Sequence, residues 1–532
     1  MATAAKMAAM FASSVTSGLA SHDESISRQA ITNADMFLKS SKNGQTSPPT
    51  PTPALAAHQP AHQPAHAAHK PPHASSLISH NRDENKRLEA GFHPNPAPRD
   101  VTKTVDPLGC TNVNKVVGCM TRWNKTLINR SAVAQRGLSD VSIVVAFTAD
   151  QCAWDRDVDF SENPPIIFDE SFEIVRPVLE DNYRMVRVTA GSKLILDCPG
   201  TNITSLAVTT VEATCDGGRN LWIDDKTWEM KDLGCTAEAA ATIRRNTGSC
   251  GSEDIGVIHI IGFEILGILG PESFYELIRV CFDPTSETTL YSQNVIKGRN
   301  IAAKDVDPNR PDFKTSSGFF TVSMSSVYSQ NSQLNLMTEL LGDSDLANQT
   351  INVSKEFYFA KGHLAPDADF VTVPEQDATY FYINAVPQWQ AFNNGNWKYL
   401  EFATRDLAES HGDLTIFSGG WGVLQLNDIN NNIVEIYLGL SEDQKVVPAP
   451  AVTWKVIHDE ARQQAVAVVG VNNPHLTTAP TRLCDDLCDR LTWINFDISD
   501  LVHGFTYCCT VDDLRQAVPH VPDLGDVELL TE

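Results

Sequence analysis

The sequence predicts an α+β protein in which strand-rich and helix-containing regions follow one another along the chain. Short runs of β-branched and aromatic residues, separated by Gly, Pro, Asn and Asp, dominate residues 135–290. Beyond residue 300, similar runs alternate with helix-like stretches, whereas the first hundred residues show neither pattern. We therefore divide the chain into a disordered segment at 1–104, a β-rich, cysteine-containing module at 105–295 and a mixed α+β domain at 296–532.

The first segment has the composition of a chain that does not fold. Residues 47–98 are rich in Pro, Ala and His and offer little apolar surface to offset the entropy lost on ordering. The histidines of this stretch could bind a transition metal weakly, but a solvated linker is the stronger interpretation. Residues 1–20 form a poor signal peptide.

Five strand-like runs define the second region, which holds eight of the twelve cysteines. We predict a β-rich, disulfide-stapled module that is either separate from the sheet of the following domain or continuous with it. The predicted strands are Val141–Phe147, Arg184–Cys198, Ser205–Cys215, Gly256–Leu269 and Phe274–Phe282.

Cysteine content favours an oxidising compartment. The chain has twelve cysteines, an even number, which is typical of disulfides in a secreted protein. Zinc binding at Cys484-x-x-x-Cys488 and free thiols remain alternatives. Five Asn-x-Ser/Thr sequons also favour a secreted glycoprotein. These sequons begin at Asn124, Asn129, Asn202, Asn348 and Asn352.

Charge and hydropathy exclude two classes of protein. No apolar run reaches about 18 residues, so a membrane-spanning helix is not predicted. The formal net charge of −25 argues against a protein that holds nucleic acid passively, because Lys and Arg normally drive phosphate binding. It does not exclude turnover of a polyanion where positive charge is local and a divalent cation supplies the rest.

The third region mixes the two periodicities, and helices are predicted at Ser332–Leu341 and Asn393–Ser410. The predicted strands are Gly318–Tyr328, Phe357–Ala360, Thr379–Asn384, Leu414–Phe417, Ile433–Leu438, Thr453–Ile457 and Ala465–Val471.

A histidine loop, Lys-Gly-His-Leu-Ala-Pro at 361–366, lies between two of these strands. Gly362 lets the backbone approach a substrate, and Pro366 stiffens the turn. His363 is a natural general base near neutral pH. A single histidine in a loop is most often structural, so its function depends on its neighbours.

The helix predicted at Asn393–Ser410 supplies those neighbours. Asn393, Trp397, Glu401 and Arg405 are spaced by four and share one helical face. Taken singly, each has a structural explanation: a helix cap, a core tryptophan and a surface ion pair. Taken together, an amide oxygen, a carboxylate and a guanidinium opposite a histidine loop suit a hard cation such as Mg²⁺ and a phosphate.

These residues carry a resemblance to a known family. Ala360–Phe370 resembles the Asp-Arg-Gly-His signature of the DNA/RNA non-specific endonucleases, which have a ββα-metal active site. The blocks at 384–388 and 393–405 resemble the next two blocks of that family, in the same order. Outer segments at 194–200, 247–250 and 507–514 resemble its secreted arthropod branch, which includes crustacean nucleases. The resemblance covers roughly 105–520 and implies a ββα-metal core within a mixed or antiparallel sheet.

The resemblance implies a role for each matching residue and a broad activity. The implied enzyme cuts single- and double-stranded DNA and RNA to 5′-phosphate products, with no membrane partner and, as in some members, a homodimer. Its cofactor would be Mg²⁺, with Mn²⁺ as an alternative. The implied roles are His363 as general base, Asn393 as metal ligand, Glu401 as a metal contact through water, Asn384 as an orienting catalytic residue, Lys361 and Arg405 as catalytic and substrate-binding cations, and Gln388 as a substrate contact.

Two departures from the family pattern stand beside the histidine. Lys361 replaces an Arg and Ala360 replaces an Asp, which removes the bidentate fork that matches phosphate geometry. We therefore expect a slower or more selective enzyme, and a catalytically weakened nucleic-acid-binding relative is the alternative. The family also uses an upstream Arg, for which Arg299 and Arg310 are candidates.

Overall fold

A computed structural model describes residues 150–532 apart from 268–272, 308 and 442–443, and the side chains of 246 and 247 are also not described. The predicted disordered segment, the first predicted strand, Cys110, Cys119 and the first two sequons lie outside these residues. Within them, no helix is long and apolar enough to cross a membrane.

Residues 150–235 form two small antiparallel sheets stapled by disulfides Cys152–Cys215 and Cys198–Cys235. The first has the order β1-β4-β3 and the second β2-β5-β6-β7-β8. Their core is the apolar faces of these strands around Trp154 and Leu196, both fully buried. The strands are β1 (Gln151–Asp155), β2 (Ile166–Phe168), β3 (Val178–Glu180), β4 (Tyr183–Thr189), β5 (Lys193–Asp197), β6 (Thr210–Cys215), β7 (Asn220–Ile223) and β8 (Lys226–Glu229), followed by the short turn η1 (Met230–Asp232).

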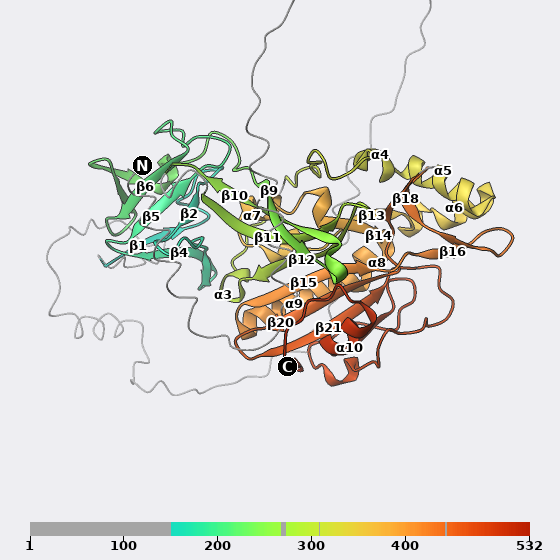
Figure 1. Ribbon diagram of the computed structural model, residues 1–532. Coiled ribbons are helices and arrows are strands. Elements are labelled where there is room, and N and C mark those ends of the chain that lie inside the picture. The colour runs from blue at the N-terminus through green and yellow to red at the C-terminus, as the bar shows by residue number, and fades with distance from the viewer. Residues whose placement is uncertain (1–149, 268–272, 308, 442–443) are drawn as a thin grey trace, which may run out of the picture. The chain divides into compact units, whose positions relative to one another are not determined.

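A nine-stranded sheet organises the rest, in the order β22-β21-β20-β15-β12-β11-β10-β9, with β23 parallel to β21 (Figure 1). All its other pairs are antiparallel, as predicted. It takes strands from both sides of residue 296, which favours the continuous alternative, although the division into domains stays a prediction. The strands are β9 (Thr242–Cys250), β10 (Gly256–Ile265), β11 (Ser273–Asp283), β12 (Thr288–Ile296), β15 (Leu414–Trp421), β20 (Val452–Asp459), β21 (Gln464–Val471), β22 (Thr506–Cys509) and β23 (Glu528–Leu529).

Helices and hairpins pack on this sheet between residues 298 and 448. The helices are α3 (Gly298–Ile301), α4 (Met324–Val327), α5 (Gln330–Leu341), α6 (Ser344–Thr350), α7 (Val373–Asp377), α8 (Gln390–Phe392) and α9 (Lys398–His411), with α10 (Val511–Ala517) near the C-terminus. Single turns are η2 (Ser252–Asp254), η3 (Val353–Lys355), η4 (Asp367–Asp369), η5 (Tyr382–Asn384), η6 (Asn393–Trp397) and η7 (Cys488–Arg490). Hairpin strands are β13 (Phe359–His363) with β14 (Ala385–Trp389), β16 (Gln425–Asn427) with β17 (Ile433–Glu435), and β18 (Tyr437–Ser441) with β19 (Gln444–Pro448).

Two predicted strands are wrong, and both fail for local reasons. In Gly318–Tyr328 the serines bond to one another, as in the 2.9 Å contact between Ser323 Oγ and Ser326 Oγ, and α4 begins after Ser323. Thr379–Asn384 ends in the turn η5, because the strand that pairs with β13 begins one residue later, at Ala385. The helix α5 follows its prediction, with Ser329 as its N-cap and Gly342 at φ +70° after its last turn.

The helix α9 lies on one face of the sheet, and this contact fixes the site. Leu400, Leu407 and Ala408 of α9 are buried in the same core cluster as Ile416 and Val468 of the sheet. The helix is therefore held in a fixed orientation on the sheet.

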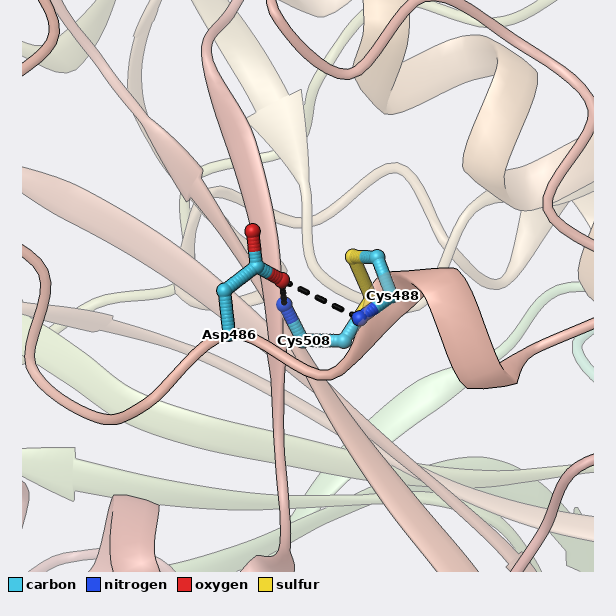
Figure 2. A group of neighbouring side chains, drawn as sticks. All are labelled: Asp486, Cys488 and Cys508. Carbon is cyan, nitrogen blue, oxygen red and sulfur yellow. Dashed lines mark hydrogen bonds between the residues drawn. A yellow bond between two sulfur atoms is a disulfide. The ribbon is translucent and has the colours of Figure 1, made fainter.

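The last cysteines form disulfides rather than a zinc site. Cys484 pairs with Cys509 and Cys488 with Cys508, so the adjacent Cys508 and Cys509 do not pair with each other. Asp486 lies beside this pair, but its Oδ1 accepts the backbone N–H groups of Cys488 and Cys508 at 3.1 and 3.2 Å (Figure 2). Asp486, Cys488 and Cys508 therefore have structural roles as a backbone acceptor and a disulfide. With Cys250–Cys281, the described residues hold five disulfides, which confirms the disulfide prediction.

Candidate active site

The hairpin β13–β14 places His363 at the end of its first strand, opposite Ala385. The ring of His363 lies between aromatic neighbours, with centroids 4.8 Å from Phe313 and 4.9 Å from Tyr380. Its Nε2 is buried and has no hydrogen-bond partner among the described residues. Burial lowers the pKa of His363 to about 4, although Asp367 opposes the shift. The imidazole is therefore neutral at pH 7 and free to accept a proton.

Positive charge reaches this histidine from two directions. The Nζ of Lys361 lies 5.2 Å from the centroid of Phe313, which is also the ring against His363. Arg310 pairs with Asp367 at 3.2 Å, and both Arg310 and Lys361 help to lower the histidine pKa. Of the two upstream candidates, the structure thus brings Arg310 to the site. Arg299 instead acts on Glu180 of the small sheets.

Gln388 does not lie where a substrate contact would. Its side chain is fully buried, and its Nε2 donates to Thr453 Oγ1 at 3.3 Å. It packs beneath Gly362, where an added Cβ would lie 2.2 Å from Gln388 Oε1. This position favours a packing role for Gln388, and its contact with substrate stays a prediction. Gly362 is needed for this close approach of the Gln388 side chain.

Asn384 is a clamp on the loop that follows His363. Its Nδ2 donates to the carbonyls of Ala365 at 2.8 Å and Thr379 at 3.0 Å, and its Oδ1 accepts the N–H of Ala365 at 3.1 Å. The residue is fully buried, so all its polar groups serve the backbone. This geometry favours a positioning residue, and a direct contact with substrate is not available in this conformation.

The predicted helix at Asn393–Ser410 begins with a π-helical turn instead of a regular one. Asn393 opens this turn, η6, and Gly395 breaks it with φ −94° and ψ −125°. A Cβ on Gly395 would lie 2.5 Å from the carbonyl of His503. Asn396 Nδ2 donates to the carbonyls of Asp497 and Gly504 at 2.7 and 2.8 Å. The C-terminal region thus holds the backbone that presents Asn393.

The side chain of Glu401 forms no ion pair among the described residues, although the charges of Lys455 and Arg405 act on it. Burial raises its pKa to about 7, with Lys455 opposing the shift and Asp369 adding to it. No hydrogen bond to its side chain is found within the part of the chain described. A carboxyl held this way gains most from a bound cation, because the cation would favour its charged form.

Arg405 is held by a buried carboxylate that the sequence did not single out. Its Nη1 lies 3.0 Å from Asp369 Oδ1, and the two side chains are 8% and 2% exposed. Its guanidinium also lies 5.0 Å from the ring centroid of Phe402. Asn294 Nδ2 donates a hydrogen bond to Asp369 Oδ2 at 3.4 Å. The ion pair fixes the fork of Arg405 at the edge of α9.

A buried lysine lies under the same helix. Lys455 is 1% exposed, its Nζ donates to Ser418 Oγ at 2.7 Å, and it lies 5.4 Å from the Trp397 ring centroid. Strand register places Ser418 and Lys455 opposite each other on β15 and β20. Burial lowers the pKa of Lys455, while Asp369 and Glu401 oppose the shift. Its charge is thus part of the same electrostatic cluster.

The chemistry of this donor set fits a hard divalent cation. Asn393 offers an amide oxygen and Glu401 a carboxylate, both oxygen ligands of the kind Mg²⁺ prefers. The carboxylate has no protein cation in direct contact among the described residues, and its raised pKa leaves a demand for positive charge. The chemistry of these residues therefore fits a metal, with Asn393 as the group that would bind it directly and Glu401 as the group that would hold it through water.

Asp369 and Lys455 were missed for different reasons. Asp369 lies within the block 360–370 that carries the resemblance, and this position is the signal that could have indicated it. Lys455 stands in the middle of the apolar run at 453–457, and an unpaired charge in such a strand marks a buried polar contact.

Known proteins similar to this chain are nucleases and salivary proteins. The DNA/RNA non-specific endonuclease family matches residues 263–514. A salivary endonuclease of Lutzomyia longipalpis is 28% identical over 63% of this chain and 75% of its own. The salivary protein Tsal1 of Glossina morsitans morsitans is 26% identical over 64% of this chain and 82% of its own. The solved EndoG/EndoGI complex aligns at 18% identity over 40% of this chain and 80% of that chain, but its TM-score of 0.28 carries no argument.

The matched region begins inside β10 and ends inside α10, so it contains both the hairpin and α9. Members of this family are metal-dependent nucleases, and this chain is similar to the DNA/RNA non-specific endonucleases over residues 263–514.

Proposed function

We propose that this chain is a Mg²⁺-dependent endonuclease that hydrolyses phosphodiester bonds of DNA and RNA and leaves 5′-phosphate ends. One observation carries the proposal: a neutral histidine with a buried, unpartnered Nε2 lies in the same charged cluster as a fixed arginine and an uncompensated carboxylate. Asp367 links the two halves, since it acts on the pKa of both His363 and Glu401.

His363 would act as the general base. A water aligned with Nε2 gives up its proton to that nitrogen while its oxygen attacks phosphorus. The bond from phosphorus to the 3′-oxygen breaks, and the leaving oxygen takes a proton from solvent. The products are a 5′-phosphate and a 3′-hydroxyl. The aromatic walls keep His363 unprotonated and limit the positions open to water.

Arg405 and Lys361 would hold the phosphate. Arg405 is preorganised by Asp369, so little of its side-chain entropy is lost when it meets an anion. Lys361 adds a point charge on the hairpin side. A divalent cation bound by Asn393, and held by Glu401 through water, would stabilise the charge that develops on phosphate oxygens and on the leaving group. Asn384 fixes the backbone of the loop after His363 through hydrogen bonds to Ala365. Asn396 fixes the backbone of the turn that contains Asn393 through its hydrogen bond to the carbonyl of Asp497.

A cleavage assay tests this assignment directly. Purified protein is incubated with supercoiled plasmid and with RNA, in Mg²⁺ or in EDTA, beside His363→Ala. Cutting that needs both Mg²⁺ and His363, with ends that accept label from polynucleotide kinase only after phosphatase treatment, is the expected result. Unchanged cutting by His363→Ala would remove His363 as the base. A gel shift without cutting by the wild type would favour the weakened nucleic-acid-binding relative.

We also propose that the protein is secreted and glycosylated. The relatives named above are salivary proteins, and five disulfides suit an oxidising compartment. Asn202 and Asn348 are exposed, as a glycan requires. Treatment of the exported protein with an N-glycosidase should lower its mass.

A further inference from the structure

Two aromatic side chains stand on the outer face of α9, where a helix normally presents polar residues. Tyr399 is 48% and Phe402 49% exposed. They are three positions apart, so their side chains are neighbours on the helix surface. The apolar residues that α9 needs for packing, such as Leu400 and Leu407, face the opposite way and are buried. The stability of the fold does not account for this exposed pair.

The pair is continuous with the phosphate-binding edge of the site. The guanidinium of Arg405 lies 5.0 Å from the Phe402 ring centroid. At the other end, Tyr399 is stacked against Phe496, with centroids 6.4 Å apart and an interplanar angle of 26°. Lys398 places its Nζ 5.8 Å from the Tyr399 ring. Two exposed rings thus lie between two cations, and one of those cations is the proposed phosphate ligand.

The exposed aromatic pair offers a source of affinity for nucleic acid that does not depend on the net charge of the chain. A protein with a net charge of −25 gains little from long-range attraction to a polyanion. Stacking of a base on an aromatic ring does not depend on net charge, and each stacked base contributes affinity of its own. Every base has a π face, so stacking does not select a sequence.

We propose that Phe402 and Tyr399 form a stacking platform for one or two unpaired nucleobases next to the phosphate held by Arg405. The inference rests on the proposed function and deepens it by naming the substrate class: single-stranded nucleic acid, or a duplex locally opened at the site. Bases inside an intact duplex have no free face for such a platform. The same enzyme therefore discriminates by strandedness and not by sequence.

The test compares ring replacements on substrates with and without bases. Phe402→Leu keeps apolar volume but removes the π face, whereas Phe402→Trp keeps it. A short single-stranded oligonucleotide is compared with the same backbone made abasic on either side of the cleavable bond.

We expect Phe402→Leu to raise KM for the base-bearing strand about tenfold, Tyr399→Leu to act in the same direction, and Phe402→Trp to restore the wild-type value. All three variants should resemble the wild type on the abasic strand. Ile433→Ala, an exposed apolar residue on β17, is the matched control and should change neither.

Two results would overturn the platform. One is an equal loss on abasic and base-bearing strands, which would make Phe402 a support for Arg405 alone. The other is a leucine variant that performs as well as tryptophan. Fluorescence anisotropy of the labelled strands with protein in EDTA separates this inference from the proposed function: a binding preference for base-bearing over abasic strands that is lost in Phe402→Leu supports the platform even if no cleavage occurs.

Discussion

The hairpin half of the site, around His363, has aromatic walls, whereas the helix half, around Glu401, is lined by charged groups. Burial favours the neutral form of the titratable group in both halves. It lowers the pKa of His363 to about 4 and raises the pKa of Glu401 to about 7. The proposed base needs the neutral form of His363, which burial already favours. The proposed metal site needs the charged form of Glu401, which a bound cation would favour. Under the proposed function, the fold alone therefore prepares the base, whereas the metal half needs its cation.

Removing the base should have the largest effect on activity. We expect His363→Ala to lower kcat on plasmid DNA by about 10²- to 10⁴-fold, the usual contribution of a positioned base. The fold should survive, because the Nε2 atom of His363 has no hydrogen-bond partner among the described residues and the backbone pairing with Ala385 is kept. Plasmid nicking in Mg²⁺ measures the loss, and circular dichroism checks the fold.

His411→Gln is the matched control for that variant. His411 ends α9 ten residues after Glu401, about 15 Å along the helix, so its replacement should leave kcat close to the wild-type value. A loss in His411→Gln as large as in His363→Ala would mean that stability, not chemistry, explains both variants.

The buried ion pair of the helix half allows a sharper comparison of stability. Asp369→Asn leaves the guanidinium of Arg405 buried without its countercharge, and loss of one partner of a buried pair costs about 3 kcal/mol or more. Asp367→Asn, two residues away, breaks a pair whose arginine side chain is 67% exposed, so it should cost less than about 1 kcal/mol. Urea unfolding of the two variants measures both values. Equal losses in the free energy of unfolding would show that the buried Asp369–Arg405 ion pair does not stabilise the fold more than the exposed Asp367–Arg310 pair does.

The sequence predicts the elements of the site better than their contacts. A strand just before His363 and the helix with Glu401 and Arg405 follow from local periodicity, whereas the antiparallel sheet was implied by the family resemblance. The partners of these residues come from elsewhere in the chain: Asp369 from a turn, Lys455 from the strand β20, and Phe313 from a loop. No local pattern specifies which distant side chains meet. The π turn at Asn393 escaped prediction because its cause, the approach of His503 to Gly395, is also non-local.

The pH dependence should separate the two halves. Between pH 5 and 7, His363 stays neutral, while Glu401 becomes protonated as the pH falls below about 7. A cation must then displace a proton, so the Mg²⁺ concentration for half-maximal activity should rise about tenfold per pH unit below 7. A titration of activity with Mg²⁺ at several pH values measures this slope, and Glu401→Gln should abolish it. A flat dependence in the wild type would remove Glu401 from the metal site.

The same shift has a consequence for stability without metal. A carboxyl whose folded pKa lies above its unfolded value makes the fold lose stability as the pH rises from about 4.5 to about 7. His363 acts in the opposite direction, because its folded pKa lies below its unfolded value and its contribution is lost as the pH falls from about 6.5 toward 4. Added Mg²⁺ should offset only the Glu401 contribution, which thermal melts in EDTA and in Mg²⁺ can separate.

The smallest expected effect is on the hairpin side, at Lys361, where the family has an arginine. The Nζ of Lys361 already lies 5.2 Å from the Phe313 ring, so a guanidinium at this position could stack on the same ring and present a planar fork to the phosphate. We expect Lys361→Arg to raise kcat/KM on DNA about fivefold or less, since one charge replaces another and only the geometry of the contact improves. Lys361→Met, which keeps the length of the chain but removes the charge, should lower kcat/KM instead. If Lys361→Arg is slower than the wild type, the aromatic half is shaped for a lysine, and the departure from the family is then an adaptation of this site and not a weakness in it.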